Sequence, residues 1–165
     1  EDGNRYELVH GELLVSPAPR TMHQRVVGNL YFALRSFLMQ QPCGEVLMSP
    51  ADISWGGLPD VSVQPDVFVV APQGEKVREW SDVRQLSLVV EVLSPSTARY
   101  DRFTKRRLYQ EMQVPLYWII DVEQHRAEVW TPDSTFPVFE ERALTWLPID
   151  CAHSLSIDLE ALFDT

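Results

Sequence analysis

The chain has 165 residues, of which 45% are hydrophobic, and a formal net charge of −10. This length supports a full hydrophobic core, so we expect a single domain over residues 1–165. The acidic balance argues against a protein that coats nucleic acid, because nonspecific affinity comes mainly from neutralising phosphates with Lys and Arg. One basic element can still meet a phosphate, because five of the 14 basic residues fall close together, at Arg99, Arg102, Lys105, Arg106 and Arg107.

The two cysteines, Cys43 and Cys151, lie far apart and outside any metal-binding spacing. We interpret them as core or surface thiols of a reducing compartment. The apolar stretches have the length of strands and no basic-then-apolar leader begins the chain, so we expect a cytoplasmic protein. Because the chain starts at Glu1 without an initiator methionine, we also expect that an N-terminal segment precedes it.

The N-terminal part predicts a hairpin followed by a long helix. Residues 6–9 and 12–16 are strand-like runs on either side of His10-Gly11. Over residues 21–40 the apolar side chains recur at three-to-four spacing, which indicates an amphipathic helix with Thr21 as its cap.

The middle of the chain predicts several strands and a second helix. Three runs suit strands, at residues 45–48, 51–55 and 62–71, and a polar loop follows over 72–84. The strand at 86–93 is almost entirely apolar. Turn and cap residues at 94–97 then predict a helix that runs to about Met112.

The C-terminal part predicts mainly antiparallel structure. Residues 116–122 and 126–131 form a hairpin, and shorter strands follow at 138–140 and 143–147, before a last helix at 159–163. The element order predicts an α/β fold, with a mixed central β-sheet flanked by helices and additional antiparallel strands at both ends.

Glu91 is the most informative residue, because it places a carboxylate inside the apolar strand 86–93. A buried carboxylate without a partner costs several kcal/mol, so Glu91 must be paired, metal-bound or protonated. A structural salt bridge is one interpretation. A functional site is the other, since ionisable groups in such positions concentrate at sites.

Two residues can answer the charge of Glu91. Asp66 precedes the apolar run 67–70, although an aspartate beside proline at a strand start is often only turn chemistry. Lys105 lies on the apolar stripe of the second helix, and its alternative role is an i,i+4 pair with Asp101. Two acids and a lysine together predict hydrolysis with a divalent cation, because Mg²⁺ binds one or two carboxylates, waters and substrate phosphate.

Several motifs then resemble a known family. They are the runs Tyr-Glu-Leu-Val-His-Gly-Glu-Leu-Leu-Val-Ser-Pro (6–17), Val-Gln-Pro-Asp-Val (63–67), Val-Val-Glu-Val-Leu-Ser-Pro-Ser-Thr (89–97) and Val-Pro-Leu-Tyr-Trp-Ile-Ile-Asp (114–121), with His23, Asp101, Lys105 and Tyr109. Over nearly the whole chain the sequence resembles the Uma-two family, also called domain of unknown function eight-twenty. The resemblance implies the restriction-endonuclease-like fold of the PD-(D/E)xK nucleases, an endonuclease acting on DNA, and a homodimer.

The resemblance also implies roles for individual residues. Asp66, Glu91 and Lys105 would be catalytic, and Mg²⁺ or Mn²⁺ would be held by Asp66, Glu91, the carbonyl of Val92 and Glu12. Leu93 stands where the superfamily usually has its lysine, so that role would pass to Lys105 on the helix. The further contributors would be His23, Gln64, Asp101 and Arg102.

Alternatives remain for the roles of two residues and for the function of the whole protein. Glu12 is equally compatible with a solvated strand end, and His23 with a polar surface group. A noncatalytic dimeric binding or assembly protein that retains the nuclease fold would suit the acidic net charge. A two-carboxylate glycosidase is disfavoured, because Lys105 has no role in that chemistry.

Overall fold

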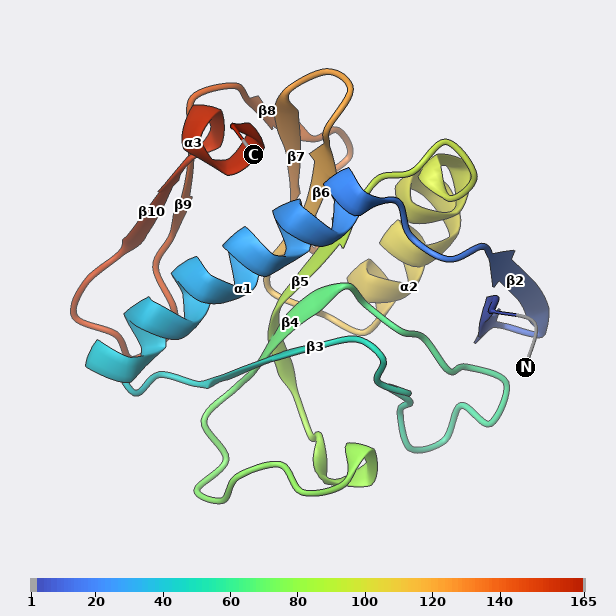
Figure 1. The fold of residues 1–165 in the computed structure, drawn as a ribbon. Coiled ribbons are helices and arrows are strands. Elements are labelled where there is room, and N and C mark those ends of the chain that lie inside the picture. The colour runs from blue at the N-terminus through green and yellow to red at the C-terminus, as the bar shows by residue number, and fades with distance from the viewer. Residues whose placement is uncertain (1–2, 165) are drawn as a thin grey trace.

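The computed structural model describes residues 3–164 and contains a six-stranded mixed sheet between two helical layers (Figure 1). The sheet has the strand order β3-β4-β5-β6-β7-β8, formed by Glu45–Met48, Val67–Val70, Leu86–Val92, Tyr117–Asp121, Arg126–Trp130 and Val138–Glu140. Only β5 and β6 run parallel to each other, and the other neighbours are antiparallel. The predicted mixed α/β fold is therefore confirmed.

Helix α1 (Thr21–Gln40) covers one face of the sheet, as Figure 1 shows. Its buried residues repeat at four-residue intervals, at Val26, Leu30, Leu34 and Leu38, and pack against alternate side chains of β4, β5 and β6. The helix has the predicted bounds. Thr21 is not its cap, because the chain already turns helical at Thr21 and the cap position falls on Arg20, without a side-chain hydrogen bond.

A separate two-stranded antiparallel sheet packs against the core beneath α1. Strand β9 (Ala143–Trp146) pairs with β10 (Leu155–Asp158), and α3 (Leu159–Phe163) follows directly. The Asp158 side chain accepts a hydrogen bond from Ala161 N–H and so caps α3. Strand β10 was not predicted, since a four-residue run with only two apolar side chains gives a weak pattern.

Helix α2 (Arg106–Glu111) covers the opposite face, directly after one π-helical turn at Tyr100–Lys105. Leu108 and Tyr109 pack there against β5 and β6, in a second core that also contains Val9 and Leu14 of the N-terminal hairpin. In the π-helical turn, Asp101 and Lys105 are both buried. Single π-helical turns inside helices are frequent at functional sites.

The N-terminal hairpin forms a sheet of its own, drawn at the right of Figure 1. Strand β1 (Arg5–Val9) pairs with β2 (Glu12–Ser16) through the positive-φ residues His10 and Gly11, as the sequence predicted. Within the described residues, three main-chain hydrogen bonds attach the hairpin to the body of the protein, two between Leu8 and Ser62 and one from the Gly11 N–H to the Asp60 carbonyl.

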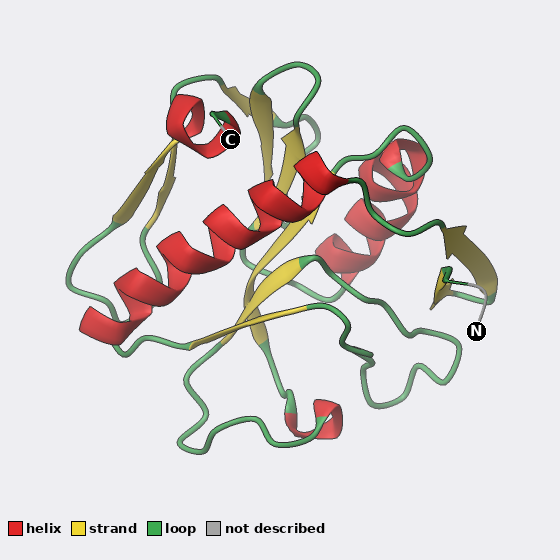
Figure 2. Ribbon diagram, viewed as in Figure 1, coloured by secondary structure: helices red, strands yellow, loops and turns green. Residues whose placement is uncertain are grey.

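Two predicted strands are shorter than expected, and the chain between β3 and β5 is largely loop (Figure 2). The expected strand at 51–55 is reduced to one bridge between Ile53 and Val63, because Pro50 and the glycines after Trp55 break the run on both sides. The expected strand at 62–71 is interrupted at Pro65, so β4 begins only at Val67. Inside the expected loop at 72–84, a 3-10 turn forms at Trp80–Asp82.

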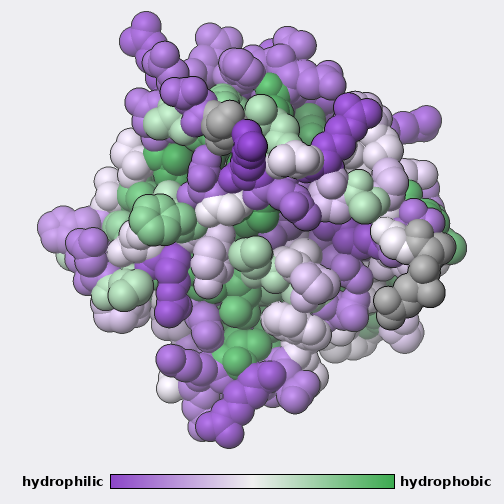
Figure 3. Space-filling view, in the orientation of Figure 1, coloured by the Kyte–Doolittle hydropathy of each residue, from purple (hydrophilic) through white to green (hydrophobic). Residues whose placement is uncertain are grey.

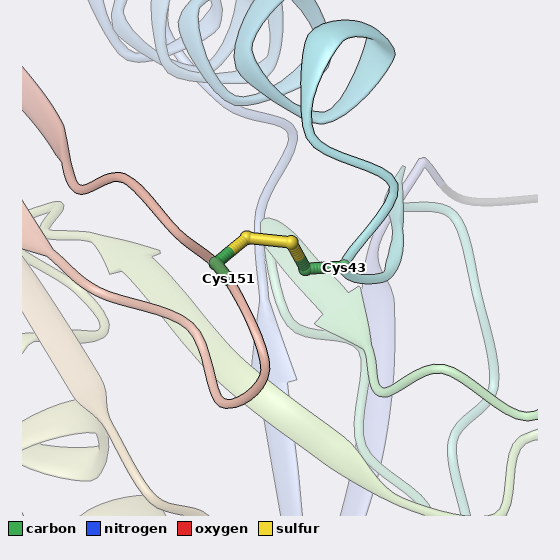
Figure 4. The surroundings of a disulfide bond; sticks show 2 residues. All are labelled: Cys43 and Cys151. Atoms are coloured by element: carbon green, nitrogen blue, oxygen red, sulfur yellow. A yellow bond between two sulfur atoms is a disulfide. The ribbon is translucent and has the colours of Figure 1, made fainter.

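Cys43 and Cys151 form a disulfide, which corrects their interpretation as separate thiols (Figure 4). Their Cα atoms lie 5.8 Å apart although 108 positions separate them in sequence. The bond joins the chain just after α1 to the segment between β9 and β10, and the argument from reduced cysteines to a reducing compartment loses its basis. No helix within residues 3–164 is long and apolar enough to cross a membrane.

The surface on the α1 side is mixed in polarity (Figure 3). Polar side chains dominate this view, and the apolar ones lie in patches between them. Phe32 and Met39 are among the exposed apolar side chains of α1. Single exposed apolar residues are ordinary for a folded protein, so this face carries no functional assignment.

Candidate active site

Lys105 is the centre of a group of buried charged side chains beneath α2. Its Nζ lies 2.9 Å from Glu7 Oε2, 3.0 Å from Glu91 Oε1 and 3.4 Å from Asp101 Oδ1. The Lys105 side chain is only 1% exposed. The π-helical turn directs it onto the sheet, as its position on the apolar stripe of the helix predicted.

Glu91 lies in the middle of β5 and has the partners that its burial demanded. Its Oε1 accepts hydrogen bonds from Lys105 Nζ and, at 3.2 Å, from the Tyr109 hydroxyl. Burial raises the pKa of the Glu91 carboxyl well above its usual value, against the opposite effect of Lys105. Burial alone would lower the pKa of Lys105, but the carboxylates of Glu91, Asp101 and Glu7 raise it instead. Lys105 is therefore charged at neutral pH.

Asp66 lies just before β4 and receives three hydrogen bonds. Its Oδ1 accepts from Arg5 at 2.9 Å, and its Oδ2 pairs with His23 Nε2 at 3.0 Å and accepts from Val92 N–H at 2.8 Å. Burial acts to raise the pKa of Asp66, but the bonds with His23 and Arg5 bring it well below its usual value. Asp66 is therefore ionised.

Glu7 of β1 connects the surroundings of Asp66 with those of Glu91. Its Oε1 accepts from Gln64 N–H at 2.7 Å, while its Oε2 approaches Lys105 and, at 3.9 Å, Arg5 Nε. The structure thus brings together six charged side chains, which we call the buried charge cluster: Arg5, Glu7, Asp66, Glu91, Asp101 and Lys105.

Arg5 and Glu7 were missed by the sequence analysis. They alternate with the buried Val9 on β1, and this period of two is the signal that could have placed them on the inner face. The signal was obscured because two of the three apolar residues of the strand, Tyr6 and Leu8, lie on its other face. In the structure Tyr6 is 47% exposed, so the hairpin turns a largely polar face inward.

Other predicted site residues lie around the buried charge cluster rather than in it. The Gln64 side chain donates to Asp52 at 2.9 Å. Arg102 turns toward β6 and β7, where it pairs with Asp121 at 2.7 Å and Glu128 at 2.6 Å. Glu12 is exposed on β2, and within residues 3–164 no recorded hydrogen bond or ion pair joins it to Asp66 or Glu91.

The predicted basic element does not form one phosphate-binding surface. Lys105 points inward, Arg102 is paired with two acids, and the Arg106 guanidinium lies over the Trp130 ring at 4.7 Å. Arg99 and Arg107 are exposed.

The donor set of the cluster suits a hard divalent cation. Its four carboxylates and two cations leave an excess of two negative charges when all are ionised. Within residues 3–164 no three His, Cys, Asp or Glu side chains form a complete metal-binding group. Two carboxylates, from Asp66 and Glu91, match the demand of Mg²⁺, which takes its remaining ligands from water and substrate phosphate.

A cleft of about 860 Å³ reaches the Asp66 side of the cluster. Arg5, Gln64, His23 and Asp66 contribute to its lining. A smaller pocket of about 190 Å³ adjoins Arg5 and His23 and is bounded by the loop Ser94-Pro95-Ser96-Thr97. Asp66 and Arg5 of the buried charge cluster therefore lie beside a space that a ligand can enter, which makes this region a candidate active site.

The comparisons with known proteins specify the family. The family model described as "Uma2: Putative restriction endonuclease" matches residues 1–160, so the chain belongs to the Uma2 family. This confirms the resemblance identified in the sequence.

A solved structure supports the fold. The crystal structure titled as a "putative nuclease belonging to DUF820" from Anabaena variabilis is 20% identical in sequence. The match covers 96% of this chain and 89% of that one, with a TM-score of 0.75. The predicted nuclease-like fold is thereby confirmed. No curated protein matches the chain.

Proposed function

We propose that the protein is an endonuclease that hydrolyses DNA phosphodiester bonds with Mg²⁺ or Mn²⁺. The observation that carries the proposal is the convergence of Asp66, Glu91 and Lys105 in one buried cluster beside a cleft, although they come from the start of β4, the middle of β5 and the π-helical turn. Membership of a family described as "Putative restriction endonuclease" favours a nuclease, and DNA is the substrate that this description suggests.

Asp66, Glu91 and the carbonyl of Val92 would hold the cation. A bound divalent cation lowers the pKa of water and polarises a phosphoryl oxygen. The N–H of Val92 already fixes Asp66, so the same residue would orient one carboxylate through its N–H and offer its carbonyl to the cation. Glu12 is not part of this proposal, because it is exposed on the hairpin and Glu7 takes the inward position.

Lys105 has two tasks in this proposal. It holds Glu91 in a fixed position through the 3.0 Å contact, and its positive charge lies beside the place where negative charge develops during hydrolysis. Asp101 is the most distant of its three carboxylate partners, at 3.4 Å, so this contact would be the one that Lys105 exchanges for an attacking water. Before substrate binds, the contact with Asp101 helps to hold the Lys105 side chain in its direction toward the sheet.

Substrate would approach from the cleft that contains His23 and Gln64. His23 holds Asp66 Oδ2 and is therefore a positioning residue. Gln64 lies at the wall of the cleft and can meet the substrate backbone. We further propose one nuclease-like domain and retain the homodimer and the cytoplasmic location as predictions.

The test is cleavage of supercoiled plasmid DNA and of short single- and double-stranded oligonucleotides, with Mg²⁺, Mn²⁺ or chelator. Wild type is expected to cleave only with a cation, and Glu91→Gln and Asp66→Asn to lose about a hundredfold or more in rate. Glu75→Gln removes an exposed acid of the 72–84 loop and serves as the matched control.

The noncatalytic alternative makes the opposite prediction. It is favoured by the net charge of −10 and by the internal pairing of the cluster carboxylates. Wild type that cleaves no substrate with either cation, yet is folded, would support a binding or assembly protein and contradict the nuclease.

A further inference from the structure

Arg5 holds one oxygen of Asp66. Its Nη1 lies 2.9 Å from Asp66 Oδ1 and also donates to the Gln64 carbonyl at 3.2 Å. His23 and Val92 approach the other oxygen, Oδ2. Of the recorded hydrogen bonds within residues 3–164, only that of Arg5 engages Oδ1.

A guanidinium and a divalent cation cannot both lie against the same carboxylate oxygen without strong repulsion. The Val92 N–H belongs to the β5 main chain and cannot move aside on its own, and His23 carries a charge only when it is protonated. Arg5 is the partner that always carries a positive charge. It is therefore the group with which a cation on Asp66 competes most directly.

Arg5 also has room to move. It stands at the open end of the β1–β2 hairpin, and the main-chain hydrogen bonds that attach the hairpin lie further along the chain, at Leu8 and Gly11. Its side chain is 23% exposed and borders both the large cleft and the smaller pocket. Rotation of this one side chain would free Oδ1 without unfolding the hairpin.

We propose that Arg5 occupies the cation position on Asp66 and that binding of the divalent cation displaces the Arg5 side chain into the adjoining cleft. Arg5 then sets the cation concentration at which the site assembles. This inference rests on the proposed cation site at Asp66 and Glu91, and it adds a regulating residue to that site.

The first test is calorimetric titration of the metal-free protein with Mn²⁺, without DNA. Arg5→Gln is expected to bind Mn²⁺ about tenfold more tightly than wild type, since a positive charge has left the site. Arg5→Lys keeps a charge and is expected to stay near wild type. Arg35→Gln removes the same charge from an exposed position of α1 and is the matched control.

The second test uses wild type and so does not depend on the folding of a variant. The Arg5 side-chain Nε–H resonance is followed by NMR during a titration with Mg²⁺. It is expected to shift and to exchange faster with water when the cation binds, because the guanidinium leaves its partners.

The outcomes separate the two proposals. Equal Mn²⁺ affinity in wild type and Arg5→Gln, or weaker binding by the variant, overturns the competition while leaving the cation site intact. An unmoved Arg5 resonance in Mg²⁺-bound protein has the same meaning. If neither wild type nor Arg5→Gln binds a cation, the cation site itself is wrong and the inference falls with it.

Discussion

The main-chain N–H of Val92 donates a 2.8 Å hydrogen bond to the Asp66 side chain. Val92 directly follows Glu91, and β4 and β5 are paired with Val67 opposite Val90. The sheet register thus sets the position of both acids. Because the main chain fixes these positions, substitution of the side chains around the two acids is expected to change the electrostatic energy of the site more than the arrangement of the sheet.

Lys105→Met is expected to destabilise the protein by about 3–5 kcal/mol, because it leaves three buried carboxylates without their shared cation. Urea unfolding followed by circular dichroism measures the change. Arg107→Met, at an exposed position of α2, is expected to change stability little. Equal stability of the two variants would mean that Lys105 is not the partner of the acids.

Two kinds of feature could be predicted from the sequence: elements whose apolar residues repeat with a clear period, and an acidic residue that interrupts an apolar strand. The helix at Thr21–Gln40 and the buried Glu91 belong to this group, because the apolar pattern is long in one case and broken by a single charge in the other. The inward side of the hairpin was not predictable in the same way. Its inner residues, Arg5 and Glu7, are polar, so their burial depends on partners supplied by distant elements.

The disulfide could not be predicted either. A pair of cysteines 108 positions apart has no local signature, and only the packing of the β9–β10 segment beside the end of α1 brings them together. By contrast, Lys105 was predicted to face the sheet because its spacing with Leu108 and Met112 is local.

Cys151→Ser is expected to lower the free energy of unfolding by roughly 2–5 kcal/mol, because the bond closes a long loop and restricts the unfolded chain. Thermal or urea unfolding of the oxidised protein gives the value. Wild type treated with a reductant should unfold at the same urea concentration as the variant. No difference between oxidised and reduced wild type would show that the bond does not form in solution.

Alkaline pH is expected to unfold the protein through two buried tyrosines. Burial raises the pKa of Tyr109 and Tyr117 well above the ordinary value of 10.0. Above pH 10.0 the unfolded state loses protons that the folded state keeps, so stability is complete below that pH and falls as pH rises.

Ultraviolet absorbance of tyrosinate after a pH jump provides the measurement. Tyr109 and Tyr117 should ionise only as the protein unfolds, at the rate of unfolding. Tyr117→Phe should remove one of the late ionisations. Immediate ionisation of Tyr109 and Tyr117 would contradict their burial beneath α2.

Glu91→Gln is expected to fold and to be at least as stable as wild type in the absence of cations. The amide has the same shape, it relieves the cost of burying a charge beside Asp66 and Asp101, and Lys105 keeps Glu7 and Asp101 as partners. The same change removes a carboxylate ligand, so Mg²⁺ or Mn²⁺ affinity should fall at least about tenfold. Urea unfolding and calorimetry on the same preparation measure both effects. Equal cation affinity, or loss of the fold, would make Glu91 a structural partner of Lys105 and favour the binding-protein alternative.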